Sequence, residues 1–188
     1  MKKKLVIVLV IFVMAIGSAS ALDFMNAAEG VKDSGFLINV GVGFGTLSPY
    51  DMIVPPVGIS VEYMLPIDLP ISVGGFFDFA MYGSGNKDTF AGYYQDMPMV
   101  FGLKGSWHVD FGVPNLDIYA SVVLGYMIWE RSREYTFIGP QTQKFNMSAV
   151  YFGTHLGGRY FFTDNIGAYA ELGYSALTFA RIGLALKF

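Results

Sequence analysis

Apolar residues recur at every second position in eight segments of the chain, and this alternation constrains the fold more than any other feature. The last segment shows it most simply, because Ile182, Leu184, Leu186 and Phe188 share one face of an extended strand. An amphipathic helix would instead repeat its apolar residues every three or four positions. The pattern therefore predicts an all-β protein of eight strands.

The connections between the segments alternate between short and long. The predicted strands cover residues 36–46, 57–65, 71–82, 95–109, 116–130, 148–162, 166–175 and 181–188. Short connections rich in Pro, Asp or Asn, which are typical of tight turns, lie at 66–70, 110–115 and 163–165. The longer connections lie at 47–56, 83–94 and 131–147. Antiparallel neighbours with tight turns at one end and longer loops at the other are typical of outer-membrane barrels.

The composition indicates which solvent meets the apolar face. Charged residues make up only 14% of the chain, against roughly 25% in an ordinary soluble domain. One face of each predicted strand carries aliphatic and aromatic residues, whereas glycine, serine, tyrosine and nearly all the strand charges occupy the other. We therefore predict an eight-stranded antiparallel up-and-down transmembrane β-barrel with lipid outside and a polar lumen. A soluble barrel or sandwich is the alternative.

The inward face contains equal numbers of acidic and basic residues. They are Glu62, Asp78, Lys104, Asp117, Arg159, Glu171, Arg181 and Lys187. Because a buried charge without a partner costs several kcal/mol, we expect them to pair, with His108 and His155 nearby. Eight strands leave an interior just wide enough for side chains, which predicts a plugged lumen. Alternatively, Arg159, Glu171 and Arg181 form the gate of a narrow pore for ions or small solutes.

The first 21 residues have the features of a signal peptide. Three lysines precede an apolar run from Leu5 to Ile16, and Ala19-Ser20-Ala21 fits a cleavage site. An uncleaved anchor is the alternative. We expect cleavage after residue 21, a lead-in at 22–34 and a barrel domain at 35–188. The protein would then reside in the outer membrane of a diderm bacterium, and with no cysteine it would have no disulfides.

The end of the chain resembles a known family of small outer-membrane barrels. The segments "GGRYFFTDNIGAYAELGY" and "RIGLALKF" are similar to those of the OmpA/OmpX-like and opacity-protein-like barrels of the porin superfamily. Arg181, Gly183, Leu186 and Phe188 match the carboxyl-terminal assembly signal of that family, with leucine where an aromatic residue is commoner. The resemblance implies that the barrel assembly machinery binds this strand. It implies no single activity, because the family includes adhesins, anchors and lipid-modifying enzymes.

No residue pattern indicates catalysis, a metal or a cofactor. Two isolated histidines lack ligand spacing and a nucleophile motif. The chain is acidic overall, which argues against nucleic-acid binding. We predict a non-enzymatic outer-membrane protein with a structural role or a surface ligand on its extracellular loops, in contact with outer-membrane lipid. A narrow gated pore, a lipid-modifying enzyme that depends on His155 and a soluble periplasmic ligand-binding barrel are the alternatives.

The resemblance at the last strand generates a testable prediction. Deleting Phe188 should lower the amount of barrel in the outer membrane, because the assembly signal would be lost. The barrel refolded in detergent should be unchanged. Both quantities are measured by comparing unboiled and boiled samples on gels. Normal yield in cells would show that Phe188 is not part of an assembly signal.

Overall fold

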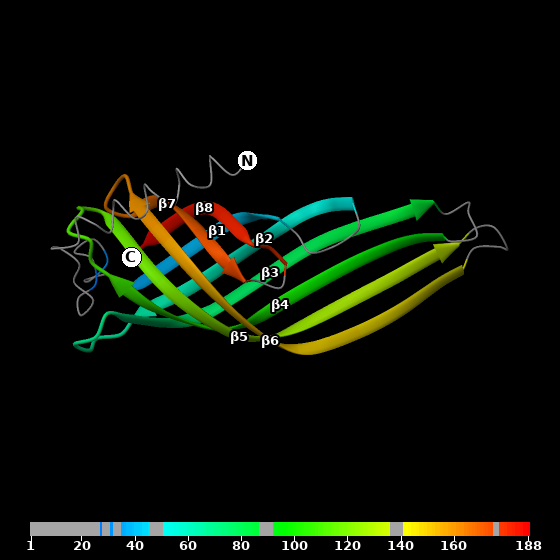
Figure 1. Ribbon diagram of the computed structural model, residues 1–188, viewed down its shortest axis with the longest axis horizontal. Helices are drawn as coiled ribbons and strands as arrows, with labels where there is room; N and C mark the ends of the chain where they lie inside the picture. The colour runs from blue at the N-terminus through cyan, green and yellow to red at the C-terminus, as the bar shows by residue number, and fades with distance from the viewer. Residues whose placement is uncertain are drawn as a thin grey trace, which may run out of the picture.

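The chain forms one closed barrel of eight antiparallel strands (Figure 1). The computed structural model describes residues 27, 31, 35–45, 51–86, 92–135, 141–174 and 177–188. The strands are β1 (Phe36–Phe44), β2 (Asp51–Met64), β3 (Ile71–Asn86), β4 (Gly92–Val109), β5 (Leu116–Tyr135), β6 (Gln141–Phe161), β7 (Ile166–Tyr174) and β8 (Ala180–Lys187). Each strand pairs with the next, and β8 pairs with β1. The predicted fold class is confirmed.

The faces of the strands are inverted relative to a soluble barrel. In β2, Val57, Ile59 and Val61 are exposed on the outer face. Glu62, on the opposite face of the same strand, is 0% exposed. Leu103 on β4 is 71% exposed, while its neighbour Lys104 is buried. A wall of exposed aliphatic side chains around a charged interior is the arrangement that a bilayer requires of a β-barrel.

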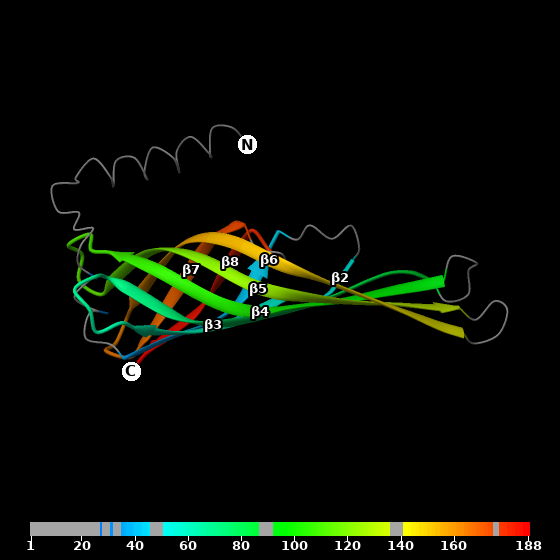
Figure 2. The same cartoon turned by 90° about the horizontal axis from the view of Figure 1, so that it is seen from below.

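Strands β3 to β6 continue furthest past the barrel as a twisted sheet, and residues 51–54 of β2 pair with β3 at its base (Figures 1 and 2). β4, β5 and β6 have 18, 20 and 21 residues, whereas β7 and β8 have nine and eight. β6 pairs with β7 only from Thr154 onward, but its pairing with β5 continues to Gln141. We call this part of the sheet the extension. It consists of residues 80–86, 92–99, 127–135 and 141–153.

The predicted long connections are too long, because parts of them belong to strands. Residues 51–56, 83–86, 92–94, 131–135 and 141–147 belong to strands. The remaining parts of those connections lie outside the described residues. The physical reason is that a sheet outside the hydrocarbon meets water on both faces, so its sequence need not alternate. In β6, every residue from 141 to 150 is exposed, whichever face it occupies.

The lumen has three layers. An apolar cluster fills the end of the barrel that carries the carboxyl terminus, and it includes Ala27 and Val31 from the predicted lead-in. Its other members are Leu37, Met64, Phe161, Tyr169 and Ala185. A second cluster at the opposite end comprises Phe76, Ala80, Tyr82, Val100, Val123, Tyr151 and Leu177. The buried charges lie between the two clusters, and Glu171 and Arg181 also line a small hollow beside Thr178 and Phe179.

The predicted signal peptide at residues 1–21 lies outside the described residues. Within the part of the chain that the structure describes, no helix combines the length and apolar character needed to cross a membrane.

Candidate functional site

Seven of the eight predicted lumen charges lie together between the apolar clusters. Each of these seven side chains is 8% exposed or less. Lys187 differs, because it lies near the end of β8 with its ammonium 4.4 Å from the centre of the Phe161 ring. The network therefore draws on β2, β3, β4, β5, β6, β7 and β8, and it ties strands from opposite sides of the barrel together.

Arg159 is the centre of the network and is fully buried. Its Nη1 donates to Asp117 Oδ2 at 2.8 Å and its Nη2 to Glu62 Oε1 at 2.5 Å. Its Nε donates to Asn39 Oδ1 at 3.0 Å, and the guanidinium lies 4.0 Å from the centre of the Tyr119 ring. All three nitrogens of the guanidinium thus have acceptors, which is the condition under which a buried arginine is stable.

Lys104 links two carboxylates on different strands. Its Nζ lies 2.6 Å from Glu171 Oε1 and 3.3 Å from Glu62 Oε1. Tyr119 also donates to Glu171 Oε1, at 2.8 Å. Lys104 is thus a compact cation shared between two carboxylates, and it could move from one to the other.

Ser72, His108 and Asp117 form a hydrogen-bonded chain that the sequence did not predict. Ser72 Oγ lies 2.9 Å from His108 Nε2, and His108 Nδ1 lies 2.8 Å from Asp117 Oδ1. This order of groups is that of serine hydrolases. Here, however, Ser72 is 0% exposed and also donates to Glu62 Oε2 at 2.9 Å. Because neither water nor lipid reaches Ser72, we interpret the chain as part of the structural network.

The part of the network around Asp78 and Arg181 has fewer hydrogen bonds. Arg181 Nη2 lies 2.7 Å from Asp78 Oδ2, and Arg181 Nη1 lies 4.0 Å from Glu171 Oε2. Among the described residues, Asp78 Oδ1, Arg181 Nε and Nη2, Ser121 Oγ and His155 Nδ1 have no partner with hydrogen-bond geometry. Of the three residues predicted to form a gate, Arg181 lies 4.0 Å from Glu171, whereas Arg159 contacts Glu62 and Asp117 instead.

The four residues of the predicted assembly signal occupy three environments. Arg181 is in the lumen, and Gly183 lies beneath the Tyr169 ring, where a Cβ would come within 2.7 Å of Cε1. Leu186 and Phe188 face outward, and Phe188 is 65% exposed. The Phe188 carbonyl also accepts from the backbone of Gly35 and Phe36, at 2.7 and 3.0 Å, at the seam between β8 and β1.

No metal site is formed by the described residues, since no three His, Cys, Asp or Glu side chains come together there in a suitable group.

The extension has its own polar contacts, which the sequence also did not predict. Arg131 Nε and Nη2 donate to the two oxygens of Asp96 at 2.7 and 2.8 Å, and Asp96 is 0% exposed. The guanidinium of Arg133 lies 4.9 Å from the Tyr94 ring centre and 4.5 Å from that of Tyr135. These bidentate and stacked contacts cross-link β4 and β5 within the extension.

Comparison with known proteins supports the fold alone. No protein-family model matches the chain, and no curated protein sequence does. A major outer membrane protein from Thermus thermophilus is 12% identical, with a TM-score of 0.62 over 83% of this chain and 100% of that one. Ail of Yersinia pestis is 15% identical over 82% and 94% of the two chains, with a TM-score of 0.47. The N-terminal barrel domain of Pseudomonas aeruginosa OprF is 17% identical over 82% and 98%, with a TM-score of 0.46.

The Thermus protein shares the overall fold of this chain. The predicted resemblance to small outer-membrane barrels therefore holds at the level of architecture.

The geometry around Arg159 predicts a large loss of stability on its removal. Replacing Arg159 with Met removes the cation that Glu62 and Asp117 share and leaves them with Lys104 and His108 as ionisable partners, which should lower the free energy of unfolding by about 3–5 kcal/mol. Adding Glu62→Gln and Asp117→Asn should restore part of the loss. Urea titration of the refolded barrel measures both effects. Arg133→Met, in the extension, is the control, and an equal loss there would contradict the central role of Arg159.

Proposed function

We propose that this chain is a non-enzymatic outer-membrane β-barrel protein whose extension is an extracellular surface for binding other proteins. The short turns and both termini would face the periplasm, which is the usual orientation of such barrels. Tyr63, Trp107 and Tyr160, all exposed near that end, would then lie at the periplasmic interface. The extension would project from the cell surface.

The observation that carries this proposal is the edge of β6. From 141 to 150, β6 pairs with β5 on one side, and no other described strand pairs with its second side. An unpaired edge presents backbone N–H and C=O groups at which an extended segment of another chain adds as a further strand. We therefore propose an extended polypeptide segment as the partner.

The side chains beside this edge favour an apolar partner on one face. Phe145 and Met147 are 53% and 58% exposed, and Met147 pairs across the sheet with Trp129. A strand added to the edge would place every second side chain on this face, so we expect alternate apolar residues in the partner. Because Asp96 and Arg131 cross-link the neighbouring strands β4 and β5, we expect little ordering of the sheet on binding.

The barrel itself would serve as an anchor in outer-membrane lipid. We propose that the barrel assembly machinery inserts it by binding the last strand, through Arg181, Gly183, Leu186 and Phe188.

A narrow gated pore is the second candidate, because Lys104 lies between Glu62 and Glu171 and could exchange partners. The two apolar clusters argue for a closed lumen. We therefore expect no conductance steps from the folded wild-type protein in planar bilayers. Discrete steps that change on Glu171→Gln would instead identify a channel. An unboiled gel of the same sample confirms that the protein is folded.

The binding proposal is tested with a displayed library of extended decapeptides, panned against the refolded barrel in lipid nanodiscs. Peptides with alternate apolar residues should be enriched. The double variant Phe145→Lys and Met147→Lys should bind them at least about tenfold more weakly, equivalent to about 1.4 kcal/mol. Thr142→Lys and Asn146→Lys add the same charge to the opposite face and should retain most of the binding. Equal weakening by both pairs, or no enrichment, would contradict the proposal.

A further inference from the structure

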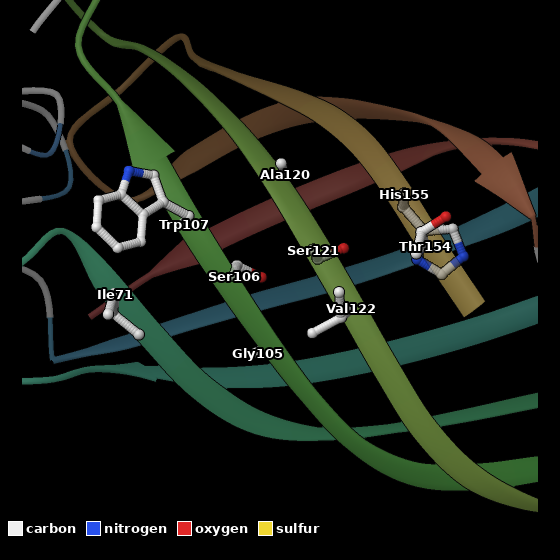
Figure 3. A pocket seen from close by; sticks show the side chains of 9 residues that line it. All are labelled: Ile71, Gly105, Ser106, Trp107, Ala120, Ser121, Val122, Thr154 and His155. Carbon is white, nitrogen blue, oxygen red and sulfur yellow. The ribbon is translucent and has the colours of Figure 1, made fainter. Parts of the chain in front are cut away.

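A furrow crosses the outer wall of the barrel over β3–β6, and Gly105 forms its floor (Figure 3). Two adjoining hollows of about 540 and 570 Å³ share Gly105 and Val122. Figure 3 shows Ile71 and Trp107 at one end and Val122 on the far side of Gly105. The furrow lies outside the lumen, and neither the charged network nor the extension accounts for it.

Gly105 is not required by the fold. A Cβ added to Gly105 would meet no atom within 4 Å, and its backbone is not in the left-handed region. Gly102 on the same strand differs, because a Cβ there would collide with the backbone of Leu124 and Gly125. A glycine inside a strand weakens the strand, and it often marks a place where a ligand or another backbone approaches closely. Gly105 therefore keeps open a space that the protein's own atoms do not use.

The furrow is narrow, so only a thin molecule fits in it. Val73 and Val122 pair with Gly105 from the two neighbouring strands. Since adjacent strands are about 4.8 Å apart, the two valine backbones are about 10 Å apart, and the space between their side chains is narrower than this. A single hydrocarbon chain fits this gap. A helix, which is about 10 Å wide or more, does not fit.

The lining of the furrow is apolar and faces the membrane. Leu103, Val122 and Leu124 stand beside it and are 71%, 54% and 57% exposed. Water in such a groove would lose hydrogen bonds, so hydrocarbon is the favoured occupant. Trp107 lies at the end near the short turns, and an indole is typical of the membrane interface. A chain lying in the furrow would therefore enter from the side of Trp107.

We propose that this furrow binds one acyl chain of a phospholipid from the periplasmic leaflet of the outer membrane. The choice of leaflet rests on the orientation in the proposed function, whereas binding of the chain rests on the furrow alone. The site is independent of the extension, so loss of peptide binding there would leave it intact.

Photolabelling in vesicles tests the proposal. The protein is refolded into vesicles of phosphatidylethanolamine and phosphatidylglycerol with a trace of phospholipid that carries a diazirine on one acyl chain. Labelled peptides are then mapped by mass spectrometry. Wild type should label several-fold more at residues 103–122 than along β1. Gly105→Phe should remove this excess, whereas Val40→Phe, which adds the same ring to an exposed position on β1, should preserve it.

A second filling variant, Ala120→Phe, covers the case in which Gly105→Phe fails to fold on an unboiled gel. Uniform labelling around the barrel would overturn the proposal, because it would show ordinary boundary lipid. An excess of label at residues 103–122 that remains in both filling variants would overturn it for the same reason. Cross-links between two copies at the furrow would also overturn it, in favour of a dimer interface. The leaflet is tested in asymmetric vesicles. If excess label at the furrow appears only when the probe is in the leaflet on the extension side, the assignment to the periplasmic leaflet is wrong.

Discussion

The ion pairs of Arg159 are the interaction on which the rest of the barrel depends. A fully buried guanidinium is stable only if carboxylates and other acceptors surround it, and here they come from β1, β2 and β5 while the arginine is on β6. These strands meet in one narrow lumen only when the sheet closes. The network therefore links closure of the barrel to satisfaction of its charges, and a partly closed sheet would leave charges unpaired.

The apolar clusters at each end of the lumen strengthen this dependence. Val31 is fully buried at one end and Leu177 almost fully at the other, and the seven charged side chains between them are 8% exposed or less. Electrostatic attraction is stronger in such a medium, and so is the cost of an unpaired charge. The atoms of Asp78 and Arg181 that lack hydrogen-bond partners therefore reduce the stabilisation that their ion pair contributes.

The sequence predicted the barrel, the two faces of each strand and the inward charges, because lipid forces strict alternation along every membrane-spanning segment. It did not predict the contacts, since parity gives the face of a residue but not its register with the next strand. The chain from Ser72 through His108 to Asp117 and the different position of Lys187 depend on register. In the extension the alternation itself is lost, and the pairing of Asp96 with Arg131 had no signal at all.

Two kinds of glycine occur in the barrel wall. Some make room for side chains of the protein itself, and one leaves space for another molecule. Gly157 lies against the Tyr119 ring and Gly41 against Tyr169, so these glycines make room for large lumen side chains. The packing of tyrosine side chains in the lumen therefore explains why these two positions are glycine. Gly105 faces the other way and accommodates nothing of the protein itself. The lipid-facing furrow and the unpaired edge of β6 are therefore two separate surfaces, and each suits a different kind of molecule.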